Sequence, residues 1–455
     1  MHCAKPLALV HHPHPLSSPK NITTMTTSEF ISLHLTSNPR DLAFLSRRYP
    51  DVDMPYALNQ IQGWQTARQK LPTWAAADGV VYPPHLNMEQ CSSEPTACYK
   101  QEVAKRWIGK LARIEVSDSK SPTQKPLRKT LLTDLTGGFG VDFSFTSRCF
   151  DEATYVERNA ELCAVVRGNL PRLGIGNARV VCGEAEEYLA DMEPQTMLFL
   201  DPARRDVNGA KTVFIADCTP DVTALLPQLI AKSRFVMLKL SPMLDWHKAV
   251  ADLRGNVREV HIVSVGGECK ELLLVMSGYF ESEAMRVVCV DISAKADADG
   301  RYSRSEFAYI EGQGIPDSPT TPIYASLQSG CGKEVMPSYL YEPNASVMKA
   351  GCFAELSRAY GVGAVGRNSH LFLSDDRVEG FPGRAFAVDA VTTLNKRELR
   401  QALSGLKQAN IAVRNFPMSV ADLRKRLKLK DGSATYIFAT TTGSGEHVLF
   451  VCHKA

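Results

Sequence analysis

The stretch LLTDLTGGFGVDFSF (residues 131–145) decides the fold. An apolar run ends at Asp134, and the glycine-rich loop 137–140 leads from it into a helical pattern. Ligands of open α/β sheets bind outside the carboxyl ends of the strands. Glycines there let the backbone approach a nucleoside closely and supply amide donors. The loop is not G-x-G-x-x-G, which disfavours a dinucleotide pyrophosphate site. The alternative is a tight strand–helix turn without a ligand.

Short apolar runs follow one another on both sides of this loop, separated by helical patterns. The runs are LLTDL, ATYVE, ARVVCG, TMLFLD and RFVMLKL, and each is typical of a strand buried on both faces. Strand–helix alternation at this spacing predicts a parallel sheet wrapped by helices, the α/β class. VREVHIVSV and ELLLVMSG have only GGECK between them. We therefore expect the sheet to end in an antiparallel hairpin.

Three further predicted strands end at acidic residues. Glu157 follows the glycine loop by about 20 residues, the spacing at which a carboxylate accepts hydrogen bonds from ribose hydroxyls. Glu184 follows the third strand and could face an adenine amino group, and Asp201-Pro202 ends the fourth. For Glu157 and Glu184 the alternative is a carboxylate that stabilises the first turn of a helix.

These strand ends resemble those of class I S-adenosylmethionine-dependent methyltransferases across about residues 128–280. The resemblance implies S-adenosylmethionine as the cofactor and an acceptor group oriented by the fourth strand end. It implies cofactor contacts from Asp134, Gly137, Gly138, Phe139, Gly140, Asp142, Glu157, Glu184 and Ala185, and catalytic roles for Asp201, Pro202 and Arg204. Methyl transfer needs mainly the alignment of donor and acceptor, and removal of the acceptor's proton.

The chain is similar, more narrowly, to bacterial class I methyltransferases that carry C-terminal ferredoxin-like and THUMP-like domains. The motifs that carry this resemblance are EQCSSEPTACYK (89–100), LDPARRD (200–206), LKLSP (238–242), VGGECKELLLV (265–275) and YLYEPNASVMKAG (339–351). The predicted parts are a tail (1–27), a helical domain (28–118), the methyltransferase domain (128–282), a connecting region (283–338), a ferredoxin-like segment (339–383) and a THUMP-like module (384–454). THUMP domains of RNA-modifying enzymes bind RNA, so the resemblance implies an RNA substrate, tRNA or rRNA.

The fourth strand end departs from the methyltransferases that modify base amino groups. Those enzymes place an aromatic residue after Asp/Asn-Pro-Pro, and this residue stacks on the flipped base. Here the tetrad is Asp201-Pro202-Ala203-Arg204. Arg204 or Arg205 could stack on a base or grip phosphate, or the two could form a solvated pair.

Two other groups of polar residues leave alternatives open. Lys239 lies in a buried run and could face the substrate, or its ammonium could reach water past the apolar strand. The polar residues of segment 90–100 could close over the cofactor, or Ser93 and Thr96 could cap a helix.

The basic residues of the C-terminal module point to a polyanionic partner. Segment 396–430 holds ten Lys and Arg against Glu398 and Asp422, a net of +8, although the whole chain has a net charge of only +3. The predicted RNA-binding residues are Lys396, Arg397, Arg400, Arg424, Lys425, Arg426 and Lys428. A merely solvated helix surface is the alternative.

Composition limits the remaining possibilities. With 455 residues and 44% hydrophobic content, the chain should form two to four globular domains. Its twelve cysteines include no C-x-x-C pair and suit a reducing cytosol. No apolar run is long enough for a membrane span, and we expect a cytoplasmic protein without a bound metal. A non-catalytic RNA-binding protein and a small-molecule methyltransferase are the functional alternatives.

Overall fold

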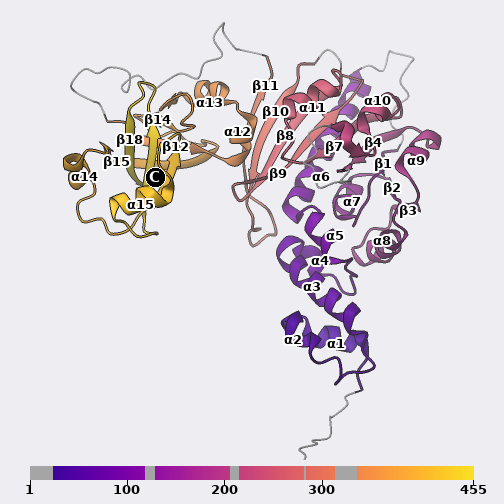
Figure 1. The fold of residues 1–455 in the computed structure, drawn as a ribbon. Coiled ribbons are helices and arrows are strands. Elements are labelled where there is room, and N and C mark those ends of the chain that lie inside the picture. The colour runs from indigo at the N-terminus through magenta and orange to yellow at the C-terminus, as the bar shows by residue number, and fades with distance from the viewer. Residues whose placement is uncertain (1–23, 118–128, 205–214, 281–282, 313–335) are drawn as a thin grey trace, which may run out of the picture. The chain divides into compact units, whose positions relative to one another are not determined.

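The computed structural model describes residues 24–117, 129–204, 215–280, 283–312 and 336–455 (Figure 1). The chain divides into two compact units, residues 1–91 and 92–455. The tail predicted at residues 1–27 lies mostly outside the described residues. In the part of the chain that the structure describes, no helix is long and apolar enough to cross a membrane.

The first unit consists of helices. They are α1 (Thr27–His34), α2 (Pro39–Ala43), α3 (Met54–Lys70), α4 (Pro72–Ala76) and α5 (His85–Gln90). Thr26 and Glu29 form a capping box at the start of α1, and Asp53 accepts the Tyr56 N–H at the start of α3. Phe30 and Ile61 belong to the core of this unit and are fully buried.

The second unit begins with the long helix α6 (Glu94–Ser117). The sequence predicts one helical domain over 28–118, whereas α6 packs on the sheet of the second unit. The reason is its apolar stripe: Tyr99, Val103 and Trp107 recur at helical spacing and are buried with strand residues of that sheet.

A nine-stranded sheet forms the centre of the second unit, in the order β11-β10-β8-β9-β7-β4-β1-β2-β3. Its strands are β1 (Leu131–Asp134), β2 (Glu152–Glu157), β3 (Ala178–Cys182), β4 (Gln195–Leu200), β7 (Ser233–Leu240), β8 (Val257–Val265), β9 (Glu268–Met276), β10 (Arg286–Ile292) and β11 (Arg304–Ile310). In the series β7-β4-β1-β2-β3 each strand pairs in parallel with the next, and β9 pairs antiparallel with β7 and β8. The predicted α/β fold class and the antiparallel hairpin are confirmed.

The sheet continues beyond the predicted hairpin. β10 pairs in parallel with β8, and β11 pairs antiparallel with β10. The sequence predicts a connecting region over 283–338, but residues 286–310 complete the edge of the sheet. Both strands are seven residues long and are joined by a polar segment rich in Asp and Ser. The apolar run VVCV in β10 is a strand signal, whereas RSEFAYI in β11 has only a weak apolar pattern.

Helices cover both faces of this sheet. Alternate residues of β4 show the two layers, because Met197 and Phe199 pack with α6, α7 (Val141–Thr146) and α8 (Ala160–Arg172). Leu198 and Leu200 pack on the opposite face with α9 (Ala185–Asp191), α10 (Val222–Ala231) and α11 (Trp246–Asp252). Short elements complete the domain: the turns η1 (Ser147–Cys149) and η2 (Ile215–Asp217), and the paired strands β5 (Ala203–Arg204) and β6 (Cys218–Thr219).

The C-terminal part forms a second, seven-stranded sheet in the order β13-β14-β12-β15-β18-β17-β16. Its elements are β12 (Tyr339–Pro343), α12 (Ala345–Ala350), α13 (Phe353–Tyr360), β13 (Gly363–Ala364), β14 (Phe372–Ser374), β15 (Gly383–Thr393), α14 (Lys396–Ala402), β16 (Asn410–Arg414), α15 (Val420–Leu427), β17 (Thr435–Thr441) and β18 (His447–Lys454). The side chains of Asn395 and Ser419 cap α14 and α15. Because β12 pairs with β15, one continuous sheet joins segment 339–383 to the module that follows.

Candidate active site

The glycine loop joins β1 to α7 at the carboxyl end of the sheet. Gly138 and Gly140 have φ of +54° and +81°, in the left-handed region that favours glycine. Gly137 needs no unusual φ but has no room for a side chain, since a Cβ there would lie 2.1 Å from Cε2 of Tyr155. The Tyr155 hydroxyl donates to the Gly138 carbonyl. The buried Tyr155 side chain therefore packs against the glycine loop and holds its backbone in place.

Glu157 holds the end of β2 against this loop. One carboxylate oxygen accepts the Gly138 N–H at 2.9 Å and the other accepts the Asn159 N–H at 2.9 Å. Each oxygen has a second lone pair, so the carboxylate can still accept hydrogen bonds from a ligand's hydroxyls. Glu184 is exposed at the N-cap of α9 without a capping hydrogen bond, and Ala185 beside it is buried. A side chain on Gly183 would meet nothing within 4 Å.

Asp201 lies at the end of β4, beside the same loop. Its N–H donates to the Thr136 hydroxyl at 2.6 Å, and its carboxylate accepts from Lys239 Nζ at 2.5 Å. The Asp201 side chain is 40% exposed. Pro202 is buried, and Arg204 lies in β5 paired with Cys218. Arg205 lies outside the described residues.

Carboxylates gather where β1, β2 and β4 end. Burial raises the pKa of Asp134 well above its usual range, the Thr136 N–H opposes this rise, and the charges of Asp142, Asp201 and Glu157 add to it. Four carboxyl groups, those of Asp134, Asp142, Glu157 and Asp201, therefore lie close enough together to influence one another. A positively charged ligand such as a sulfonium compound would relieve the repulsion. The residues present thus fit S-adenosylmethionine.

A chain of buried charges runs behind this edge. Lys100 Nζ lies 2.6 Å from Glu271 Oε1, 3.1 Å from Asp142 Oδ1 and 3.3 Å from Ser92 Oγ. Lys239 Nζ lies 3.6 Å from Asp142 Oδ2, and the Ser92 hydroxyl donates to the same oxygen at 2.7 Å. Lys100, Glu271 and Lys239 come from α6, β9 and β7, so three elements meet here. We call Lys100, Asp142, Asp201, Lys239 and Glu271 the ionic chain.

The ionic chain sets the charge of its members. Burial disfavours the ionised form of Asp142, but Lys100, Lys239 and the Ser92 hydroxyl outweigh burial and lower its pKa. Burial likewise opposes the charge of Lys239, yet Asp201, Asp142 and Glu271 raise its pKa above the usual range. Lys239 is therefore an ammonium ion near neutral pH.

Sequence reasoning missed most of this arrangement. Lys239 does not reach water past the strand, because its side chain is only 12% exposed and ends on Asp201. Asp142, predicted to contact the cofactor, directs its carboxylate to Lys100, Ser92 and Lys239. Glu271 was not predicted at all. The available signals were the single charge inside the apolar run MLKLS and the charge that directly precedes the apolar run in ELLLVM.

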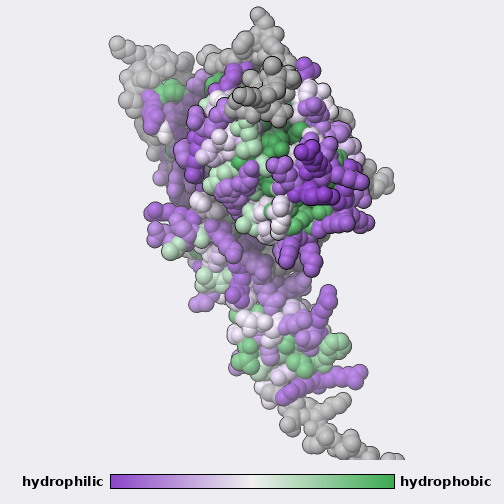
Figure 2. Space-filling view, turned by 90° about the vertical axis from the view of Figure 1, so that its left-hand side faces the viewer, coloured by the Kyte–Doolittle hydropathy of each residue, from purple (hydrophilic) through white to green (hydrophobic). Residues whose placement is uncertain are grey.

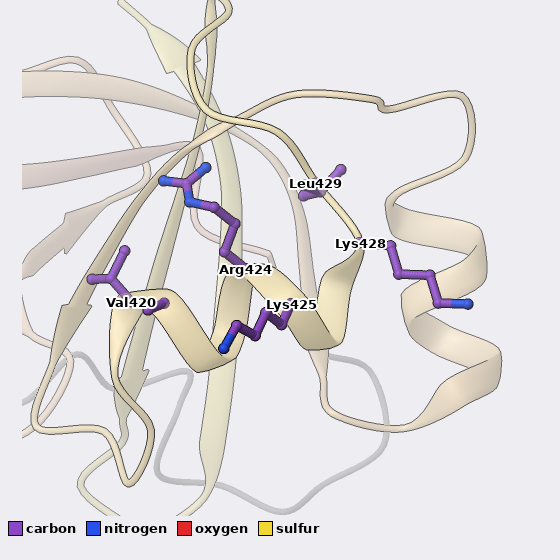
Figure 3. Close-up of a pocket in the computed structure, with 6 residues that line it drawn as sticks. Val420, Arg424, Lys425, Lys428 and Leu429 are labelled. Atoms are coloured by element: carbon purple, nitrogen blue, oxygen red, sulfur yellow. The ribbon is translucent and has the colours of Figure 1, made fainter.

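The predicted RNA-binding residues occupy α14, α15 and the residue after α15. All are exposed except Arg424, which binds Asp431 at 2.7 Å and the Ala409 carbonyl at 3.0 Å. A hollow of about 560 Å³ lies along α15 (Figure 3). It is lined by Val420, Ala421, Arg424, Lys425, Lys428 and Leu429. Hydrophilic residues cover much of the face that the C-terminal module presents to the viewer in Figure 2.

Comparison with known proteins supports this architecture. Residues 339–382 match a ferredoxin-like domain family, and residues 383–454 match a family described as THUMP domain-like. The crystal structure of a "putative methyltransferase" from Porphyromonas gingivalis W83 is 27% identical, with a TM-score of 0.74, over 95% of this chain and 100% of that chain. A search of curated protein sequences found no match. The chain therefore has a class I methyltransferase fold followed by ferredoxin-like and THUMP-like domains.

Shorter solved structures match part of the chain only. An RNA methyltransferase candidate from Pyrococcus horikoshii is 16% identical over 37% of this chain and 72% of its own, with a TM-score of 0.25. A Streptococcus mutans protein solved with S-adenosylhomocysteine is 14% identical over 32% of this chain and 87% of its own, with a TM-score of 0.24.

Proposed function

We propose that the protein transfers a methyl group from S-adenosylmethionine to a nucleotide of structured RNA, tRNA or rRNA, which the C-terminal module holds. The observation that carries this proposal is the cluster of carboxyl groups where β1, β2 and β4 end, beside a loop that only glycine can form. When bound, the cofactor supplies a methyl group on a sulfonium.

The residues that would hold the cofactor belong to the glycine loop and the strand ends. Glu157 accepts from the ribose hydroxyls, the loop 137–140 approaches the cofactor through its backbone, and Glu184 with Ala185 borders the adenine. Asp201 orients the acceptor group. Exposed Lys and Arg side chains on α14 and α15 suit the phosphates of an RNA strand.

Titration calorimetry of the full-length protein with S-adenosylmethionine tests the cofactor. The Glu157→Gln variant should bind about 10- to 100-fold more weakly, because hydrogen bonds to a charged acceptor contribute about 1.5–3 kcal/mol. Glu161→Gln, a change at an exposed residue four positions further along, should bind like the wild type. No heat of binding with the wild type would refute the proposal.

A further inference from the structure

The ionic chain has one end in the core and the other at Asp201, which is partly exposed at the end of β4. Lys100 and Glu271 are 0% and 3% exposed, Lys239 is 12% exposed, and Asp201 is 40% exposed. Replacing buried ion pairs by apolar residues is often neutral or stabilising, so such pairs are weak evidence for stability alone. A row of charges that ends on the residue beside the acceptor suggests a use in chemistry.

The chemistry at this end differs from that expected for a base amino group. An exocyclic amine brings N–H donors, which need acceptors, and the bases are held by stacking. Here Asp201-Pro202-Ala203-Arg204 holds no aromatic residue. Asp201 instead shares one carboxylate oxygen, Oδ2, with the ammonium of Lys239. An ammonium ion beside the acceptor favours an atom on which negative charge develops.

We propose that the acceptor is a hydroxyl oxygen, the ribose 2′-hydroxyl of RNA, and that Lys239 and Asp201 act on it together. This inference rests on the proposed methyl transfer to RNA. The 2′-hydroxyl is both donor and acceptor, and distinguishes RNA from DNA. It therefore matches a site that presents one carboxylate and one ammonium.

The roles follow from the charges. The acceptor oxygen forms a bond to the methyl carbon while the sulfur–carbon bond breaks, and that electron pair stays on sulfur. The hydroxyl proton passes to the Asp201 carboxylate and then to water. Lys239 donates to the acceptor oxygen and offsets its developing negative charge. Lys100 is a positioning residue, because it fixes Asp142 and Glu271, whose charges face Lys239.

Alkaline hydrolysis identifies the acceptor. Full-length protein is incubated with methyl-labelled S-adenosylmethionine and bulk RNA from cells that lack the protein, and the RNA is then hydrolysed with alkali. A 2′-O-methyl group removes the hydroxyl that attacks the neighbouring phosphodiester, so the label should appear in dinucleotides. Label in mononucleotides would overturn the hydroxyl acceptor. No label in RNA at all would instead refute the proposed function.

Substitutions at Lys239 test its role separately. Lys239→Met should lower kcat for RNA about 100-fold or more, the usual loss when one donor to a developing oxyanion is removed. Lys239→Arg, which keeps the charge, should recover part of this loss. The exposed Lys295→Met serves as the control and should behave like the wild type.

A binding measurement distinguishes this role from a structural one. Loss of the Lys239 charge leaves Asp201 without its cation and Asp142 with Lys100 alone. Lys239→Met should therefore favour the cationic S-adenosylmethionine over neutral S-adenosylhomocysteine more strongly than the wild type does. Equal weakening of both ligands, or kcat within about threefold of wild type, would overturn the role of Lys239.

Discussion

Lys100 illustrates what a single residue contributes. Its side chain is fully buried on α6, yet it carries a charge, and its ammonium contacts Glu271 on β9 and Asp142 on α7. The sequence shows Lys100 only as one of several polar residues in a helical segment. Its partners Glu271 and Asp142 lie 171 and 42 positions further along the chain, and no local sequence pattern connects them to Lys100. Long-range ion pairs of this kind could not be predicted.

Replacing this lysine should destabilise the fold in a pH-dependent manner. Lys100→Met leaves Glu271 buried without its ion-pair partner and Asp142 with only the more distant Lys239, and breaking a buried pair typically costs about 3–5 kcal/mol. In the wild type the pKa of Asp142 is lower in the folded state than in the unfolded state. This difference stabilises the fold at pH values above the pKa of the unfolded state. The stabilisation is lost as the pH falls through the pKa of the folded state.

In the variant the pH dependence changes. Burial already raises the pKa of Glu271 in the wild type, and loss of Lys100 should raise it further and raise that of Asp142 as well. The variant should therefore lose stability relative to the wild type as the pH rises above about 4. Urea unfolding at pH 5 and pH 8 should show a larger deficit relative to the wild type at pH 8. A deficit below about 1 kcal/mol, or an equal one at both pH values, would contradict the role of Lys100 as a buried counterion.

At the scale of secondary-structure elements, the contact between β2 and the glycine loop restricts which residues the loop can contain. The sequence predicted the loop, the strand before it and the acidic end of the next strand, because each has a local signature. It did not predict that Tyr155 on β2 supports the loop and excludes a Cβ at Gly137. Strands β10 and β11 were also missed. The apolar run VVCV of β10 was a local strand signal, whereas RSEFAYI of β11 has little apolar periodicity.

Gly137→Ala should therefore be costly although its backbone is unstrained. The methyl group would collide with the Tyr155 ring and displace the loop, with a loss of about 1–3 kcal/mol in stability and weaker cofactor binding. Gly176→Ala is the matched control, because Gly176 is exposed and its Cβ would have open space. Thermal unfolding and calorimetry of both variants provide the comparison. If Gly137→Ala behaves like Gly176→Ala, the inference that Tyr155 supports the loop is wrong.

At the scale of the whole molecule, the C-terminal part is one folded body. Leu340 and Leu373 pack with Phe386, Phe438 and Phe450 in a shared core, and β15 completes the sheet beside β12. The sequence predicted the order of strands and helices in the module from residue 384 onward. It could not predict that the segment before it shares the sheet. A deletion from residue 384 would expose this core, so point substitutions are the cleaner test of RNA binding.

Charge reversal on α15 and just after it should weaken RNA binding. In Lys425→Glu/Lys428→Glu, two phosphate contacts are lost, so the slope of log affinity against log salt should become shallower by about 2. The control variant Lys105→Glu/Lys295→Glu changes the net charge of the protein by the same amount, but at exposed positions outside the C-terminal module. Filter binding across a salt series measures both. Equal slopes for the two variants would exclude α15 as a phosphate-binding surface.

Transfer of labelled methyl groups to RNA tests the central claim most directly. The wild-type protein should incorporate label from S-adenosylmethionine into RNA from cells that lack it, and much less into RNA from cells that contain it, where the position is already methylated. Cofactor binding without label in either RNA would contradict an RNA methyltransferase.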